Sequence, residues 1–130
     1  MPEPLWIRDD VVLAIHRRQL AEHGGAEGVR DVGLLASALA RPRSFLAYDG
    51  AKPDLSTLAS AYAFGIVQKH PLVDGNKCTA HVVCRTFLIL NGYDLAATRQ
   101  KKCSTFLSLA RGDSAEGELI TWMREHLVAR

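Results

Sequence analysis

The sequence lacks an apolar run long enough to cross a membrane, and no useful alternation of apolar and polar residues is present. A membrane-spanning helix needs roughly 18 or more consecutive apolar residues, so association with a membrane is not expected. Without alternation, a β-sheet protein is not expected either. The start, Met1-Pro2-Glu3-Pro4, has no basic residues followed by an apolar stretch, which predicts no secretory signal.

A strong charge of one sign is also lacking. There are 16 Lys and Arg residues against 14 Asp and Glu residues, which leaves a net charge of +2. Basic residues occur in short groups, such as Arg99 to Lys102, rather than in one long run. Such groups are usually solvated helix faces. Direct binding to nucleic acid is therefore not expected.

Cysteine is scarce: only Cys78, Cys84 and Cys103 are present, without the spacing of a metal site. An odd number of thiols without a pairing pattern is typical of the reducing cytoplasm, where we expect this protein to act. Cys84 lies among Val83 and Phe87, which predicts a small buried side chain.

What is present is a chain of helical segments separated by Gly and Pro, in 130 residues of which 48% are hydrophobic. This length and composition predict one all-α domain, residues 1–130. The expected helices, in chain order, are Asp9 or Asp10 to about His23, a short helix capped by Asp31 and ending before Pro42, Leu55 to Lys69, Asn76 to Leu90, Thr98 to Ala110, and Ser114 to Leu127.

Two segments of this pattern call for a further interpretation. The stretch from Arg43 to Pro53 has no helical period and predicts a loop or small flap, in which Tyr48 and Asp49 either align a target peptide or belong to an ordinary loop. From Ala80 to Leu90, only three residues interrupt the apolar ones. A helix that is apolar nearly all round is expected inside the domain.

The stretch from His70 to Ala80, His-Pro-Leu-Val-Asp-Gly-Asn-Lys-Cys-Thr-Ala, concentrates more reactive side chains than any other part of the chain. His70 is a titratable base, and Asp74 supplies a carboxylate just before a Gly-Asn-Lys run that opens a helix. Backbone N–H groups at a helix start favour anions. A carboxylate can hold Mg²⁺, and an imidazole can take the proton of an attacking hydroxyl. The pattern indicates chemistry on a phosphate group.

This stretch resembles the signature of the Fic/Doc family, in which His-x-Phe-x-(Asp/Glu)-Gly-Asn-(Gly/Lys)-Arg joins two central helices. Gly28-Val29-Arg30-Asp31 is similar to an early signature of the Doc proteins, and Asn91-Gly92-Tyr93 is similar to the family's ending of the motif helix. The resemblance extends from about Trp6 to Leu127. It implies a compact bundle of about six helices around a buried motif helix.

The resemblance also implies roles for single residues. The matching histidine, His70, would be the proton acceptor, and the matching acid, Asp74, would bind Mg²⁺ or orient the hydroxyl. Gly75, Asn76 and Lys77 would cradle phosphate. The family's adenylyltransferases usually carry Gly where this chain has Lys77, whereas a lysine there is the form of the Doc kinases, which present the γ-phosphate of ATP.

The chain departs from the family pattern at Leu72, where Phe is usual, and at Cys78, which replaces a phosphate-binding Arg. A thiol has no fixed positive charge and no bidentate fork. Lys77, His81 and Arg85 recur at helical spacing and form a basic stripe that can compensate. We therefore expect Cys78 and Arg85 to line the nucleotide site, with pairing of Arg85 to a core carboxylate as the alternative.

Together, these features predict a Doc-type toxin of a toxin–antitoxin pair. It would be an Mg-ATP-dependent kinase that phosphorylates a Ser or Thr hydroxyl, and the resemblance implies elongation factor Tu as the target and translation arrest as the outcome. The implied partner is an antitoxin whose disordered C-terminal segment folds on binding. Two alternatives remain open: a Fic-type protein adenylyltransferase, and a catalytically weakened protein that serves as a binding or regulatory module.

Overall fold

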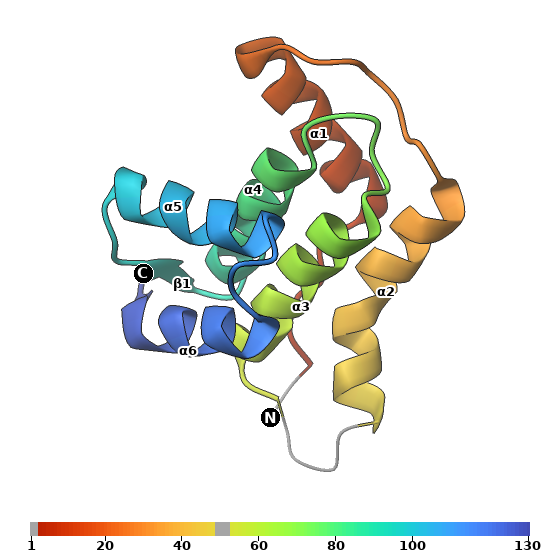
Figure 1. The fold of residues 1–130 in the computed structure, drawn as a ribbon. Helices are drawn as coiled ribbons and strands as arrows, with labels where there is room; N and C mark the ends of the chain where they lie inside the picture. The colour runs from red at the N-terminus through yellow and green to blue at the C-terminus, as the bar shows by residue number, and fades with distance from the viewer. Residues whose placement is uncertain (1–2, 49–52) are drawn as a thin grey trace.

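The computed structural model describes residues 3–48 and 53–130, in which six helices and two short strands are present (Figure 1). The elements are α1 (Asp9–His23), α2 (Val32–Tyr48), α3 (Leu55–Lys69), α4 (Asn76–Leu90), β1 (Tyr93–Leu95), α5 (Arg99–Ala110), α6 (Glu116–His126) and β2 (Leu127–Ala129). The prediction of a helical bundle is confirmed. None of the helices in the described ranges is long and apolar enough to cross a membrane.

The helices α3 and α4 form the centre of the bundle (Figure 1). The helices α2 and α6 pack on α3, α1 packs on α4, and α5 touches both central helices. Val83, Cys84 and Phe87 of α4 are completely buried, and Tyr62 of α3 packs with its ring centroid 5.2 Å from that of Phe87. The expected interior position of α4 and the buried role of Cys84 are confirmed, because a helix surrounded by other helices must be apolar on most sides.

Asp54 caps the start of α3. Its carboxylate accepts hydrogen bonds from the Thr57 N–H at 2.9 Å and from the Arg124 guanidinium at 2.8 Å. Partial burial acts to raise the pKa of Asp54, but the hydrogen bonds from Arg124 and Thr57 outweigh it and lower the pKa from 3.8 to about 2. The ionised cap therefore joins α3 to α6 and satisfies a free N–H group at the helix start.

Replacing Asp54 by alanine is expected to lower the free energy of unfolding by about 1 kcal/mol near pH 7, the usual effect of removing an N-cap. Because the carboxylate has a lower pKa in the folded protein, its contribution is present above pH 3.8 and is lost as the pH falls through about 2. Urea titrations of both proteins at several pH values measure this difference. Asp113→Ala, in the turn after α5, is the control, and a difference that persisted below pH 2 would contradict the prediction.

The second helix is longer than predicted. The sequence suggested an end before Pro42, followed by a loop from Arg43, but α2 continues through Pro42 to Tyr48. Pro42 has no N–H for the Ala38 carbonyl, and at that carbonyl α3 approaches closely: a Cβ atom on Gly65 would lie 3.2 Å from the Ala38 oxygen. Packing offsets the lost hydrogen bond. Asp49, predicted to belong to a loop or small flap, lies outside the described residues.

Arg41 provides much of this packing around the second half of α2. Its guanidinium lies over the rings of Phe45 and Phe64, at 4.7 and 5.0 Å from the ring centroids, and it pairs through both terminal nitrogens with Glu116. Aromatic faces and a carboxylate together satisfy a half-buried guanidinium. Phe64 and Glu116 lie far from Arg41 in the sequence, so the local pattern around Pro42 did not show these two contacts.

Two strands of three residues each were not predicted. β1 pairs antiparallel with β2, with Asp94 opposite Val128. Three residues are too few to show an alternating pattern, and the pairing joins segments more than thirty residues apart.

The last two helices begin close to the predicted positions. Thr98 caps α5, while Ala115 rather than Ser114 precedes α6, where the Glu118 carboxylate accepts a hydrogen bond from the Ala115 N–H at 3.1 Å.

Candidate functional site

The segment between α3 and α4, which we call the motif loop (His70 to Gly75), reverses the chain within a few residues. His70 ends α3 in a left-handed conformation, with φ 47° and ψ 54°, and Gly75 precedes α4 with φ 75°. His70 is the one residue other than glycine with a positive φ among the described residues. A side chain held in this conformation costs free energy, so the surrounding structure has to stabilise it.

Arg30, in the connection between α1 and α2, supplies part of that stabilisation. Its guanidinium donates hydrogen bonds to the carbonyl oxygens of His70 at 2.6 Å and of Lys69 at 2.8 Å. Its backbone N–H donates to the Pro71 carbonyl at 2.7 Å. Next to Arg30, the backbone of Val29 forms an isolated antiparallel β-bridge with that of Leu72. A cation at the last carbonyls of a helix is also favourable for the helix dipole. The connection therefore clamps the C-terminal end of α3 and the start of the motif loop (Figure 1).

Replacing Arg30 by glutamine is expected to loosen the motif loop. Two charge-assisted hydrogen bonds are lost, each worth about 1.5–3 kcal/mol, so the amide protons of Leu72, Val73 and Gly75 should exchange with solvent at least about tenfold faster. Hydrogen–deuterium exchange measures this. Arg18→Gln, which removes an exposed arginine paired with Glu22 on α1, is the matched control. Unchanged exchange in the loop would contradict a clamping role for Arg30.

Asn76, the first residue of α4, packs its side chain against the motif loop rather than facing solvent, and 8% of its surface is exposed. Its side-chain oxygen accepts from the Leu72 N–H at 3.1 Å, and its amide nitrogen donates to the Leu72 carbonyl at 3.0 Å. The same nitrogen lies 3.4 Å from Nδ1 of His70. The sequence suggested Asn76 as a phosphate ligand. In the structure, its side chain shapes the loop and lies against the imidazole of His70.

Asp74 joins the other end of the motif loop to α1. Its carbonyl oxygen accepts a hydrogen bond from Nε2 of His16 at 2.8 Å, and His16 is 3% exposed. Its carboxylate accepts from the Gly75 N–H at 2.8 Å and, more weakly, from the Ala26 N–H at 3.4 Å. The carboxylate lies so close to Gly25 that a Cβ atom there would approach one carboxylate oxygen to 2.8 Å. Asp74 is nevertheless exposed, which leaves room for a further ligand.

The start of α4 is open to an anion. Among the described residues, no side chain caps this helix, and the first backbone hydrogen bond into it runs from the Thr79 N–H to the Gly75 carbonyl at 2.9 Å. The preceding N–H groups of a helix have no internal partner and attract negative charge. They face an open depression of about 420 Å³, which we call the motif cavity. Its lining residues include His70, Asp74, Gly75, Asn76, Lys77 and Cys78.

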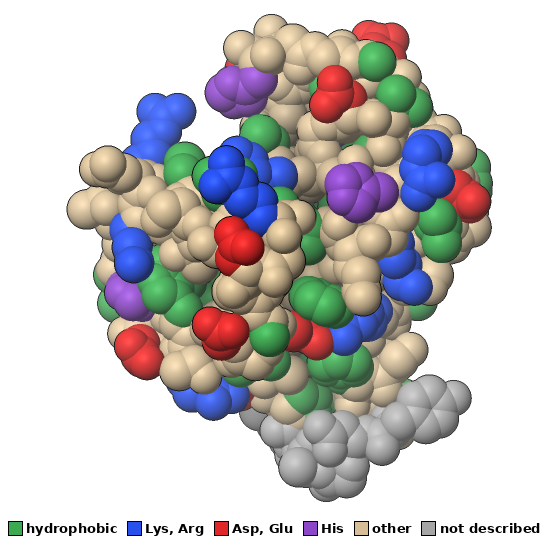
Figure 2. Space-filling view, viewed as in Figure 1, with side chains coloured by type: hydrophobic (Ala, Val, Ile, Leu, Met, Phe, Trp, Pro, Cys, Tyr) green, Lys and Arg blue, Asp and Glu red, His purple; other side chains and the backbone are tan. Residues whose placement is uncertain are grey.

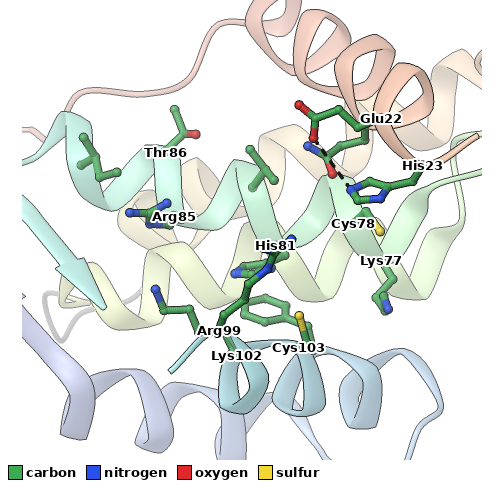
Figure 3. A pocket seen from close by; sticks show the side chains of 14 residues that line it. Glu22, His23, Lys77, Cys78, His81, Arg85, Thr86, Arg99, Lys102 and Cys103 are labelled. Carbon is green, nitrogen blue, oxygen red and sulfur yellow. Dashed lines mark ion pairs between the residues drawn. The ribbon is translucent and has the colours of Figure 1, made fainter. Parts of the chain in front are cut away.

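A second depression of about 620 Å³, which we call the cationic cavity, adjoins the first and lies between the end of α1, α4 and α5 (Figure 3). Lys77 and Cys78 line both cavities. Arg85, Arg99 and Lys102 line only the cationic cavity. The surface view shows a hollow between the end of α1 and α5 with Lys and Arg side chains at its edge (Figure 2). The predicted basic stripe of α4 therefore faces this cavity.

Two members of the stripe differ from the sequence prediction. His81 stacks on Phe106, with ring centroids 4.6 Å apart. Burial first, and then the nearby charges of Lys102, Arg85 and Lys77, lower the pKa of His81 to about 4, so this residue is neutral near pH 7. Arg85 is held by Asp94 in two hydrogen bonds of 3.0 and 3.1 Å.

Arg85, predicted to line the nucleotide site, lines the cationic cavity together with Lys77 and Cys78. Arg85 does not line the motif cavity with His70, and Asp94 neutralises its charge. The alternative drawn from the sequence was an ion pair with a core carboxylate. Arg85 does form an ion pair, but Asp94 belongs to β1 and its side chain is 22% exposed, so the partner does not lie in the core. Of the three stripe residues, Lys77 alone lines the motif cavity, and it forms no ion pair with any residue that the structure describes.

His16 and Arg30 support this site through side-chain contacts that the sequence did not indicate. Each lies more than 35 residues before the motif loop, and its side chain donates a hydrogen bond to a backbone carbonyl oxygen of that loop. Since every residue has such a carbonyl, the sequence does not show which one will be bound. Within the described ranges, no group of three or more His, Cys, Asp or Glu residues forms a metal cluster. Asp74 is thus a single carboxylate next to an anion-binding helix start.

Comparisons with known proteins agree with this geometry. A family model described as the Fic/DOC family matches residues 6–88. The chain is also 46% identical over 74 residues to Toxin Doc of Mycolicibacterium smegmatis. That alignment covers 57% of this chain and 57% of the relative, so the chain spans little more than half the length of the protein it matches. The matched family region contains the motif loop and nearly all of α4.

Proposed function

The chain belongs to the Fic/DOC family, and on that premise we propose that it is a Doc-type toxin that transfers the γ-phosphoryl group of ATP to a Ser or Thr hydroxyl of a protein. The observation that carries this proposal is the motif cavity, where His70, Asp74 and Lys77 surround the open start of α4. A base, a carboxylate, a cation and unpaired N–H groups are the parts that phosphoryl transfer requires.

His70 would act as the general base. It lies in the motif cavity at the end of α3, where Arg30 holds its carbonyl oxygen and Asn76 lies against Nδ1. With Nδ1 facing that amide, Nε2 is the atom available to take the proton of an attacking hydroxyl. A positioned base contributes roughly 100- to 10,000-fold to the rate of such a reaction.

The phosphate groups of ATP would lie at the start of α4. Gly75, with its positive φ and no side chain, lets an anion approach the backbone, and the N–H groups of Asn76, Lys77 and Cys78 face the same end of the helix. Lys77 adds the fixed charge. Because a lysine replaces the glycine typical of the family's adenylyltransferases, its side chain occupies space that the α-phosphate would need, which favours transfer of the γ-phosphoryl group.

The residues present also fit a magnesium ion. Mg²⁺ is usually held by one or two carboxylates together with substrate phosphates and water, and Asp74 offers one exposed carboxylate beside the phosphate site. When bound, the ion would neutralise phosphate charge. Asp74 would hold it, or orient the acceptor hydroxyl, while His16 and the N–H groups of Gly75 and Ala26 keep the residue in place.

Labelled ATP tests which phosphate of ATP is transferred to protein. Incubation of a cell lysate with this protein and ATP labelled at either the γ- or the α-phosphate is expected to label protein from the γ position only. The Asp74→Asn protein and a reaction without Mg²⁺ are the controls, and both should lose the label. Label that arrived from the α position would favour the adenylyltransferase and contradict the proposal.

The relative named Toxin Doc suggests the biological setting. We propose that this protein is likewise a toxin, that elongation factor Tu is its target in the cytoplasm, that phosphorylation arrests translation, and that an antitoxin neutralises it through a disordered C-terminal segment that folds on binding. Purified elongation factor Tu in the labelling experiment tests the target directly. Co-expression with the product of a small neighbouring reading frame tests the antitoxin.

One observation favours a second candidate, a weakened family member that acts as a binding or regulatory module. Cys78 stands where the family carries an arginine, and Arg85, which was expected to compensate, is paired with Asp94. A motif cavity with one fixed cation binds phosphate less firmly than one with two. Binding of ATP without any transfer from the γ position would support this second candidate.

A further inference from the structure

The cationic cavity brings together two accessible thiols that the proposed reaction does not need. Cys78 reaches it from the first turn of α4, and Cys103 reaches it from α5 (Figure 3). Cys78 is partly exposed and Cys103 is exposed. The third cysteine, Cys84, is completely buried, and burial raises the pKa of its thiol. The chain therefore contains an inert cysteine against which the other two can be compared.

The charge of this cavity is strongly positive. Among the residues that the structure describes, Lys77, Arg99 and Lys102 form no ion pair. The one carboxylate in the lining, that of Glu22, is already paired with Arg18 at 3.0 Å. A recess lined by charges of one sign concentrates counter-ions. Any reagent that reaches Cys78 through this cavity is therefore selected for negative charge.

We propose that the cationic cavity is a thiol-modification site, in which Cys78 forms a mixed disulfide with an anionic low-molecular-weight thiol. The co-reactant is the disulfide of that thiol. Carboxylates on the co-reactant would pair with Lys77, Arg99 and Lys102, and this places its sulfur atoms beside the first turn of α4. The volume of about 620 Å³ is sufficient for a molecule of peptide size.

The chemical step is a thiol–disulfide exchange. The Cys78 thiol gives its proton to solvent, and its sulfur attacks one sulfur of the bound disulfide. A bond forms between the Cys78 sulfur and that sulfur, while the original disulfide bond breaks. The other half leaves as a thiolate and takes up a proton. Cys78 is oxidised, the co-reactant is reduced, and no further oxidant is required.

This modification would also reach the motif cavity, because Cys78 lines both cavities. An adduct on Cys78 places negative charge and bulk next to Lys77, where the proposed phosphate site begins. The adduct itself does not depend on the proposed phosphoryl transfer. Its formation is measured by mass, so the two proposals can fail separately.

Three disulfides of similar reactivity and different charge provide the test: oxidised glutathione, which is anionic, 2-hydroxyethyl disulfide, which is neutral, and cystamine, which is cationic. The Cys103→Ser protein is used so that Cys78 is the one accessible thiol, and fragment-ion mass spectrometry separates Cys78 from Cys84. At low salt, oxidised glutathione is expected to modify Cys78 at least about tenfold faster than cystamine. In 1 M salt, where the screening length falls to about 3 Å, the preference should largely vanish.

A pair of matched variants tests whether the cations of the cationic cavity cause the preference for an anionic disulfide. Lys102→Glu removes a cation of the cationic cavity, whereas Lys101→Glu makes the same change at the adjacent residue, which lines a different depression between α5 and α6. Lys102→Glu is expected to reduce the preference for oxidised glutathione severalfold, and Lys101→Glu is expected to have little effect. Equal rates for the three disulfides, no reaction at Cys78 in the folded protein, or equal effects of the two variants would each overturn the proposal. The comparison of the three disulfides tests the proposal even if the Lys102→Glu protein does not fold.

Discussion

Replacing His70 by alanine is expected to lower the transfer of the γ-phosphoryl group by about 100- to 10,000-fold, which is the range for loss of a general base. Growth arrest on expression should be relieved accordingly. Among the described residues, the imidazole has one hydrogen-bonding neighbour, the Asn76 amide at 3.4 Å, so few interactions are lost with the side chain. Alanine has a Cβ atom, as histidine does, and pays a similar cost for the left-handed backbone at this position. The folded structure should therefore persist.

The measurements are the rate of label transfer from γ-labelled ATP, the growth of expressing cells, and the urea midpoint of each protein. His126→Ala is the matched control. That histidine stacks on Trp122 at the end of α6, away from the motif cavity, and its removal should leave transfer unchanged. A well-folded His70→Ala protein that kept its full rate would exclude His70 as the base.

The second large effect is expected from Cys78→Arg, which should raise the rate of transfer at least about tenfold. Removal of a single preorganised donor from an active site costs about 100- to 1,000-fold, and this change supplies such a donor. Cys78 is only partly buried and lines both cavities, so a longer side chain has space. A positive charge in the first turn of a helix opposes the helix dipole, but that cost is typically below about 1 kcal/mol.

Two further substitutions separate charge from geometry. Cys78→Lys adds a positive charge without a planar fork, and Cys78→Ser adds neither. If a bidentate phosphate contact is what the chain lacks, the rates should rank arginine above lysine, and lysine above cysteine and serine. A rate for Cys78→Arg equal to that of the unchanged protein, with folding preserved, would show that Cys78 is no deficit and that Lys77 already provides enough charge.

The grouping of the candidate site residues could be predicted from the sequence because they are neighbours along the chain. His70, Asp74 and Lys77 lie within eight residues of one another, and a loop that ends one helix and begins the next must hold them near a common point. The apolar run after Lys77 predicted a buried helix for the same kind of local reason. All three residues line the motif cavity.

The differences from prediction concern contacts that the local pattern does not show. Proline inside a helix removes a backbone hydrogen bond, so Pro42 predicted a helix end, but packing of α2 on α3 and the pair between Arg41 and Glu116 maintain the helix beyond it. Arg85 was predicted to line the nucleotide site, and in the structure Asp94 of β1, nine residues later, pairs with it. In both cases the partner belongs to another element, whose position depends on the fold.

The sequence by itself determined the order and approximate bounds of most helices, the interior position of α4, and the identity of the motif residues. These follow from periodicity, capping and spacing, which act within a few turns of the chain. Only the tertiary structure decided which groups support the motif loop and which charges remain free. Arg30 and His16 bind its carbonyl oxygens from other segments. Asp94 pairs with Arg85, so among the described residues Lys77 is the cation of α4 without an ion pair at the motif cavity. Backbone acceptors are the same in every residue, so sequence cannot show which side chain will reach them.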